Sequence, residues 1–205
     1  VLAANVYHTD TKQLVFEPFR IFEANGLSIG VIGIASNIIQ KNMPEAFWEG
    51  ADFTDGIEEA RKWTEYLKNE QADLVVLLSH LGYPQDIELL KQVDGIDLCL
   101  SGHTHNRVRS PQKINDAYII QSGALASSMG WLKLEIEDRK IAQIHHEYIV
   151  LDASIAEDPE LSQMLKEDEI LSAHREYLEE TVGETKIDLH RGSSFYGTMD
   201  YLLLD

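Results

Sequence analysis

Two short apolar runs, separated by a helical pattern, constrain the fold of this chain more than any other feature. Residues 73–78 (Asp-Leu-Val-Val-Leu-Leu) and 96–100 (Ile-Asp-Leu-Cys-Leu) are typical of buried strands. Pro84 marks a helix start between them, because proline favours the first helical turn, and apolar residues then recur at helical spacing. Strand, helix and strand in this order form a βαβ unit. The sequence therefore predicts an α/β fold in which these strands are parallel and the first is buried on both faces.

The rest of the chain predicts further elements around this unit. A helix is expected from the N-cap Asp55 to about residue 70, and a long amphipathic helix from Asp158 to Gly183. These elements divide the chain into residues 1–151, a linker helix over 152–183 and the start of a further domain over 184–205. We interpret the chain as truncated at both ends, because it opens and stops within apolar runs. Strands are expected over residues 14–24, 27–35, 118–122, 131–137 and 141–151.

Charge and composition exclude some classes of partner. The chain has 17 Lys and Arg against 35 Asp and Glu, a net charge of −18. Nucleic-acid polymers are bound by clustered basic residues, so this balance argues against them. An anionic substrate would instead have to be held by something other than surface charge, such as bound cations. No apolar run approaches the roughly 20 residues of a membrane helix, so no membrane segment is predicted. The single cysteine, Cys99, is expected to be a buried and inert thiol.

Three histidines follow the ends of the two apolar runs. His80 lies in Ser-His-Leu-Gly after the first run, and His103 and His105 lie in Gly-His-Thr-His after the second. The carboxyl ends of adjacent parallel strands meet at one edge of a sheet, where ligands collect. Side chains two residues apart in an extended backbone share a side, so two imidazoles could reach two metal ions about 4 Å apart. The pattern predicts a metal site, although any one of these histidines alone would more simply be a solvated or hydrogen-bonded residue. The remaining five are interpreted as non-functional: His8, His145, His146, His174 and His190.

Further motifs carry a resemblance to a known family. With residues 2–6 (Leu-Ala-Ala-Asn-Val), 121–123 (Gln-Ser-Gly) and 130–132 (Gly-Trp-Leu), the histidine motifs resemble the calcineurin-like metallophosphoesterases. The similarity is to the branch of 5′-nucleotidases, UDP-sugar hydrolases and 2′,3′-cyclic phosphodiesterases, and it covers about residues 1–150. It implies a four-layer α/β/β/α sandwich, of which this chain would hold the C-terminal part. Residues 182–205 resemble the bridge into the family's C-terminal domain and the first residues of that domain.

The resemblance also implies a set of ligands and a cofactor. It assigns His80 and His103 to the second of two divalent metal ions and His105 to the first, with Zn, Mn, Fe or Co as candidate ions. Asn5 corresponds to a structural residue. The family's other metal ligands and its catalytic His would lie upstream of Val1. The resemblance therefore implies that an upstream segment of the same protein completes the site, that no catalytic residue lies within the chain, and that these 205 residues alone are inactive.

The implied function is metal-dependent hydrolysis of a phosphoester of a small-molecule nucleotide, including UDP-sugars or 2′,3′-cyclic nucleotides. Arg107, just beyond the second histidine motif, is a candidate contact for the substrate anion, with a solvated loop residue as the simpler interpretation. Two alternatives stay open. One is a hydrolase of the same fold that acts on a non-nucleotide anion, such as a sulfur ester. The other is a non-catalytic fragment or binding module derived from this fold.

Overall fold

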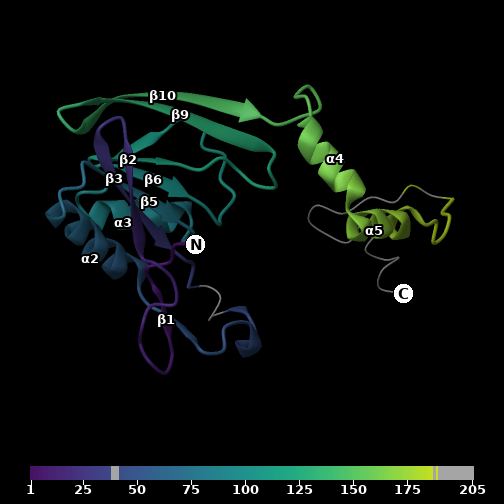
Figure 1. Cartoon of the computed structure of the whole chain (residues 1–205), viewed down its shortest axis with the longest axis horizontal. Helices are drawn as coiled ribbons and strands as arrows, with labels where there is room; N and C mark the ends of the chain where they lie inside the picture. Colours follow the sequence, from purple (N-terminus) through teal and green to yellow (C-terminus); the bar gives the residue numbers. More distant parts are fainter. Residues whose placement is uncertain (38–41, 187, 189–205) are drawn as a thin grey trace. The chain divides into compact units, whose positions relative to one another are not determined.

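The computed structural model describes residues 1–37, 42–186 and 188, and it divides into two compact units, residues 1–154 and 155–205. The first unit is built on a six-stranded mixed sheet (Figure 1). The strand order is β2-β3-β5-β6-β8-β7, in which the four inner strands are parallel and the two edge strands antiparallel to their neighbours. The strands are β2 (Phe19–Ala24), β3 (Leu27–Ile34), β5 (Leu74–Ser79), β6 (Leu98–Ser101), β7 (Gln112–Ile114) and β8 (Ala117–Ile120).

The predicted βαβ unit is confirmed. Strands β5 and β6 are parallel neighbours, and α3 (Tyr83–Gln92) connects them. The other predicted helix is α2 (Gly56–Asn69), and its N-cap is the expected Asp55. The Asp55 carboxylate accepts a hydrogen bond of 2.8 Å from the Ile57 amide, which satisfies one of the free N–H groups of the first turn. The α/β class predicted from the sequence is therefore confirmed, with a helical layer on a central sheet.

The two faces of the central sheet are buried to different extents. Leu77 and Cys99 point to the face covered by the helices, and both are fully buried. Their neighbours Leu78 and Leu100 point to the other face and keep 40% and 37% of their surface exposed. The prediction that the first strand is buried on both faces is therefore wrong. A continuous apolar run gives the two faces equal hydrophobicity, but within the described residues only one face is fully packed.

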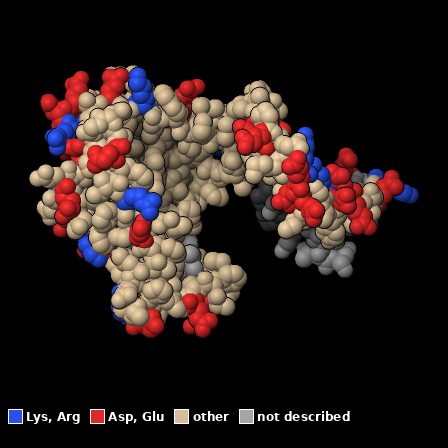
Figure 2. All heavy atoms as spheres, viewed as in Figure 1, with Lys and Arg blue, Asp and Glu red and all other residues tan. Residues whose placement is uncertain are grey.

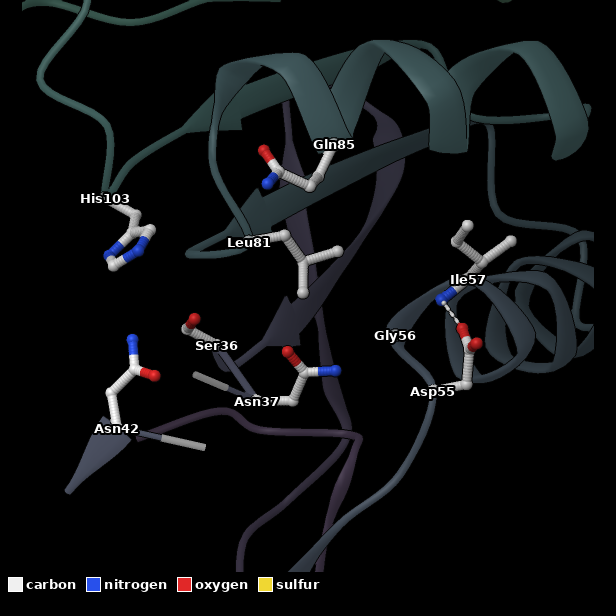
Figure 3. A pocket seen from close by; sticks show the side chains of 9 residues that line it. All are labelled: Ser36, Asn37, Asn42, Asp55, Gly56, Ile57, Leu81, Gln85 and His103. Carbon is white, nitrogen blue, oxygen red and sulfur yellow. Dashed lines mark hydrogen bonds between the residues drawn. The ribbon is translucent and has the colours of Figure 1, made fainter. Parts of the chain in front are cut away.

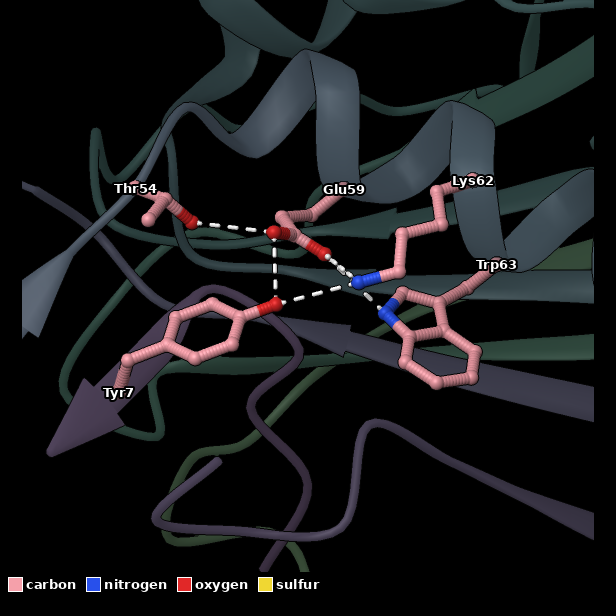
Figure 4. Close-up of polar contacts among 5 residues, drawn as sticks. All are labelled: Tyr7, Thr54, Glu59, Lys62 and Trp63. Carbon is pink, nitrogen blue, oxygen red and sulfur yellow. Dashed lines mark hydrogen bonds and ion pairs between the residues drawn. The ribbon is translucent and has the colours of Figure 1, made fainter. Parts of the chain in front are cut away.

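A polar cluster joins α2 to the strand β1 (Val6–His8) (Figure 4). The Glu59 carboxylate accepts hydrogen bonds from the Tyr7 hydroxyl at 2.7 Å, the Trp63 indole at 3.2 Å and the Thr54 hydroxyl at 3.3 Å. Lys62 also contacts Glu59 at 3.2 Å and lies 4.8 Å from the centre of the Trp63 ring. Burial and the Glu59 carboxylate raise the pKa of Tyr7. The cluster fixes the amino-terminal half of α2 against the segment that carries β1.

Smaller sheets complete the first unit. Strand β1 pairs with β4 (Ala51–Phe53), and a short 3₁₀ helix, η1 (Glu45–Phe47), precedes β4. Strands β9 (Ser128–Glu137) and β10 (Lys140–Val150) form a long antiparallel hairpin. The strand expected over residues 14–24 is shorter, since β2 begins only at Phe19. Pro18, which has no N–H to donate to a ladder, immediately precedes it.

The second unit corrects one helix prediction. The expected single amphipathic helix is divided into α4 (Pro159–Glu167) and α5 (Glu169–Glu179). Asp168 separates them with an extended backbone, and its carboxylate accepts a hydrogen bond of 2.9 Å from the Leu171 amide. An aspartate at this place caps a new helix rather than continuing the previous one. His190 and most of the segment 184–205 lie outside the described residues.

The surface is in keeping with the acidic composition. Figure 2 shows Asp and Glu side chains spread over the face in view and more numerous there than Lys and Arg. No helix in the described part of the chain has the length and apolar character needed to cross a membrane.

Candidate functional site

The ends of β5 and β6 bring two of the predicted histidines together. Ser79 and Ser101, the last residues of the two strands, face each other in the parallel register. His80 directly follows Ser79, and His103 lies two residues beyond Ser101. The centres of the two imidazole rings are 5.1 Å apart, with the ring planes tilted by 59°. The structure therefore places these side chains side by side at one edge of the sheet, as the βαβ pattern indicated.

The turns that carry the histidines have an unusual backbone. His103 and His105 have φ angles of 73° and 59°, in the left-handed region that non-glycine residues seldom adopt. Gly102 lies where a Cβ atom would come within 2.9 Å of His80 Nδ1 and 3.2 Å of the Ser79 carbonyl oxygen. Only glycine allows the second turn to approach the first imidazole this closely. The close approach of the two turns thus depends on a residue without a side chain.

A buried carboxylate links the two strand ends. Asp86, on α3, is fully buried, and its two oxygens accept hydrogen bonds of 2.5 Å from the hydroxyls of Ser79 and Ser101. Burial raises the pKa of Asp86 to about 6, against an opposing effect of the two serine hydrogen bonds. The sequence pattern does not single out this residue, because an Asp in the first turn of a helix is usually an exposed partner of the helix dipole. A signal was available: Asp86 lies three residues after Tyr83 and four before Leu90, on the buried stripe of the helix.

Gln121, on the segment that follows β8, holds the second turn through several hydrogen bonds. Its amide nitrogen donates to the Gly102 carbonyl at 2.5 Å and to the Ser101 hydroxyl at 3.0 Å. Its amide oxygen accepts a hydrogen bond from the Asn106 backbone N–H and one of 3.4 Å from the Thr104 hydroxyl. Because this side chain is 3% exposed, these bonds are formed away from water. The sequence motif around Gln121 was part of the family resemblance, but its contacts to the turn were not predicted.

The other predicted site residues lie at the surface. His105 is exposed, and its charge, together with that of His103, contributes to the pKa shift of His80. Arg107 is also exposed, and it forms no ion pair among the described residues. Asn5, by contrast, is fully buried, and its side chain both donates to and accepts from the backbone of Ala35, at 2.9 and 2.8 Å. Asn5 has the structural role that the resemblance implied.

The electrostatics of the converging imidazoles suit a cation. Partial burial, followed by the charges of His103 and His105, lowers the pKa of His80, so its ring is neutral at neutral pH. A neutral imidazole offers a lone pair to Zn, Mn, Fe or Co ions. Within the described residues, however, no group of three or more His, Cys, Asp or Glu side chains is placed to hold a metal ion. The residues present therefore fit part of a metal site and not a complete one.

A polar cavity of about 390 Å³ lies beside His103 (Figure 3). The imidazole of His103 points toward it, and Asn42 extends its amide from the opposite side. Leu81 and Ile57 supply the apolar part of the wall. The further described residues of the wall are Ser36, Asn37, Asp55, Gly56 and Gln85.

No protein-family model matches this chain. Relatives with similar sequences carry the names of enzymes that act on nucleotides. A 5′-nucleotidase of Vibrio cholerae serotype O1 is 31% identical over 121 residues, covering 53% of this chain and 22% of the relative. The trifunctional nucleotide phosphoesterase YfkN of Bacillus subtilis is 23% identical over 187 residues, covering 88% of this chain and 12% of the relative. The chain therefore corresponds to a minor part of each of these two curated relatives.

Solved structures share its fold. The sulfate thiohydrolase SoxB of Thermus thermophilus has a TM-score of 0.85 at 25% identity, covering 98% of this chain and 37% of that protein. A 5′-nucleotidase precursor, also from Thermus thermophilus, has a TM-score of 0.74 at 20% identity, with coverages of 94% and 41%. The calcineurin-like phosphoesterase YfkN of Bacillus subtilis has a TM-score of 0.67 at 22% identity, with coverages of 87% and 62%. By sequence the chain is similar to 5′-nucleotidases, and by fold it is similar to calcineurin-like phosphoesterases. In this chain the ends of β5 and β6 carry the paired histidines.

Proposed function

We propose that this chain supplies part of the metal site of a hydrolase that cleaves phosphoesters of small-molecule nucleotides. The observation that supports the proposal is the convergence of the His80 and His103 imidazoles, 5.1 Å apart, at the ends of adjacent parallel strands. In this proposal His80 and His103 bind one divalent cation, and His105 binds a second. Two divalent cations of this kind supply a hydroxide near neutral pH and neutralise charge on a phosphoryl group.

The residues of the chain have separate tasks in this proposal. His80 offers a neutral ring, because partial burial and the neighbouring imidazole charges keep its pKa low. His103 has one side toward His80 and also borders the polar cavity, so it connects the cation site with a space for substrate. Arg107 is exposed just beyond the turn and would contact the substrate anion. With a net charge of −18, the chain needs bound cations to hold such an anion.

The site needs further donors. Because the described residues include no group of three metal-binding side chains, two converging imidazoles are the core of what they provide. We propose that the remaining ligands come from an upstream segment of the same protein and that the 205-residue chain alone is inactive. We also propose residues 1–151 as part of the phosphoesterase domain, 152–183 as a linker and 184–205 as the start of a further domain. The division into compact units after Ser154 supports the first of these boundaries.

Nucleotides are the first candidate substrates, with UDP-sugars and 2′,3′-cyclic nucleotides as finer possibilities within that class. The names of the relatives support this choice, since they describe a 5′-nucleotidase and a nucleotide phosphoesterase. A second candidate is a sulfur ester. It is supported by the likeness to SoxB, whose TM-score of 0.85 exceeds the 0.74 of the 5′-nucleotidase precursor.

Hydrolysis assays on the protein isolated from its natural source test these candidates. AMP, UDP-glucose, a 2′,3′-cyclic nucleotide and a sulfur ester would each be incubated with the protein and Mn²⁺. We expect cleavage of at least one nucleotide: adenosine and phosphate from AMP, UMP and glucose 1-phosphate from UDP-glucose, or a nucleoside monophosphate from the cyclic nucleotide. The His103→Ala variant should lose this cleavage, and His174→Ala, a histidine outside both motifs, is the matched control. Turnover of the sulfur ester alone would favour the second candidate. No turnover of any of them by a protein that binds Mn²⁺ would contradict both.

A further inference from the structure

The hydrogen bonds around the two histidine turns show which residues fix the positions of His80 and His103. Ser79 and Ser101 sit opposite each other in the sheet, directly before the two turns, and a single carboxylate lies between their hydroxyls. Asp86 comes from α3, so it links a helix to the ends of two strands. It is the only charged side chain among the fully buried residues that the structure describes. Such a group is costly to bury, and its partners show what it holds in place.

We propose that Asp86, with Gln121, is a positioning residue that holds the His80 and His103 imidazoles in their converging arrangement. The inference rests on the proposed function for its purpose, because convergence matters only if the two rings bind a common ligand. Neither residue acts on an imidazole directly. Asp86 acts through the serines that precede the turns, and Gln121 acts through the backbone of the second turn.

The direction of each hydrogen bond supports a carboxylate at position 86. The Ser79 hydroxyl already accepts from the Leu81 amide at 3.2 Å, and the Ser101 hydroxyl already accepts from the Gln121 amide at 3.0 Å. Each hydroxyl therefore directs its own hydrogen to Asp86, and two acceptor oxygens receive them. An asparagine of the same shape has one acceptor oxygen and one NH₂ group. It would leave one serine facing a donor, so that one of the two strand ends would be released.

Gln121 completes the arrangement around the second turn. It donates to the Gly102 carbonyl, just before His103, and accepts from the Asn106 amide, just after His105. Both histidines of this turn have left-handed backbone angles, which persist only when the surrounding contacts fix them. The Thr104 hydroxyl, which accepts from the Tyr83 amide at 2.9 Å, connects the same turn to the start of α3. Helix, strand ends and turn thus form one hydrogen-bonded unit.

Nuclear magnetic resonance on the histidine-labelled chain without metal tests the positioning directly. We expect a cross-relaxation peak between the ring protons of His80 and His103 in the unmodified chain and its loss in Asp86→Asn. Leu90→Ala is the matched control, because Leu90 is buried on the same helix and its side chain takes no part in the hydrogen bonds to Ser79 and Ser101. The ring contact should persist in this control. A ring contact that persists in folded Asp86→Asn would overturn the proposal, and so would its loss in Leu90→Ala.

Cation binding provides a second readout. In calorimetric titrations with Zn²⁺, Asp86→Asn should bind about 10- to 100-fold more weakly than the unmodified chain, as is typical when a residue behind a metal ligand is removed. Zn²⁺ binding that is unchanged in His80→Ala and in His103→Ala would contradict the proposed function, while the ring contact would still decide the positioning. If Asp86→Asn does not fold, Ser101→Ala removes one of the two hydrogen bonds and should also abolish the ring contact. Unchanged ring contact in that variant would contradict the inference.

Discussion

Raising the pH from 4 to 7 should destabilise the first unit through Asp86. The folded-state pKa of this carboxyl is about 6, raised by burial from an ordinary value of 3.8. Between these two values the folded chain binds more protons than the unfolded chain, so its stability falls as the pH rises. The contribution is fully present below pH 3.8 and is lost above pH 6. Since one pKa unit corresponds to about 1.4 kcal/mol, the loss amounts to about 3 kcal/mol at most.

The Asp86→Asn variant isolates this contribution from the many other carboxyls of the chain. Urea unfolding followed by tryptophan fluorescence measures the first unit alone, because Trp48, Trp63 and Trp131 all lie within residues 1–154. The difference in free energy of unfolding, variant minus unmodified chain, should rise by about 2 to 3 kcal/mol between pH 4 and pH 7. The lost hydrogen bond lowers the free energy of unfolding of the variant by the same amount at every pH. It therefore shifts the difference between the two proteins without changing how that difference depends on pH. Gln85→Ala, an exposed substitution on the same helix that removes no titratable group, should give a flat difference. A flat difference for Asp86→Asn would refute the reasoning.

Packing and polar contacts determine how three further sites respond to substitution. Glu59→Gln should lower the free energy of unfolding by about 1 to 2 kcal/mol, because a charged acceptor with several donors is lost. The matched control is Glu58→Gln, which removes an exposed ion pair of 3.9 Å with Arg61 and should change the free energy of unfolding by less than about 0.5 kcal/mol. Urea unfolding decides both, and equal effects would contradict the contacts in Figure 4. By the same measurement Leu77→Ala should cost about 2 to 5 kcal/mol and Leu78→Ala markedly less, because only the first side chain is fully buried. Gly102→Ala should weaken Zn²⁺ binding in calorimetry, since its Cβ would lie 2.9 Å from a ring nitrogen of the first histidine; unchanged affinity would contradict this crowding.

The local pattern of the sequence was sufficient to predict the βαβ unit and the meeting of two histidines. Apolar runs determine strands, and the connection through α3 makes β5 and β6 parallel, so that His80 and His103 must lie at the same sheet edge. The burial of each face was not predictable in this way, because Leu77 and Leu78 are equally apolar and differ only in what packs against them. Asp168 illustrates a local competition, in which one side chain ends one helix and caps the next.

The support of the turns depends on long-range contacts that no periodicity encodes. Asp86 reaches Ser101 across 15 residues, and Gln121 reaches Gly102 across 19. Their residue types are ordinary for a helix start and for a segment after a strand, so only the fold shows that they converge. The resemblance to the family predicts which histidines bind a metal, and it says nothing of the residues that contact their turns.

In the proposed function, His80 and His103 form a common cation site at the ends of β5 and β6. The most direct test is Mn²⁺ titration of the histidine-labelled chain, with the broadening of each imidazole resonance measured by nuclear magnetic resonance. Broadening by a bound paramagnetic ion falls off steeply with distance, so each ring reports its own proximity to the ion. We predict that substoichiometric Mn²⁺ broadens the His80 and His103 signals together, and that the His103→Ala variant loses the broadening of the His80 signal. Broadening of only one of the two signals, or unchanged broadening of the His80 signal in His103→Ala, would contradict a shared site.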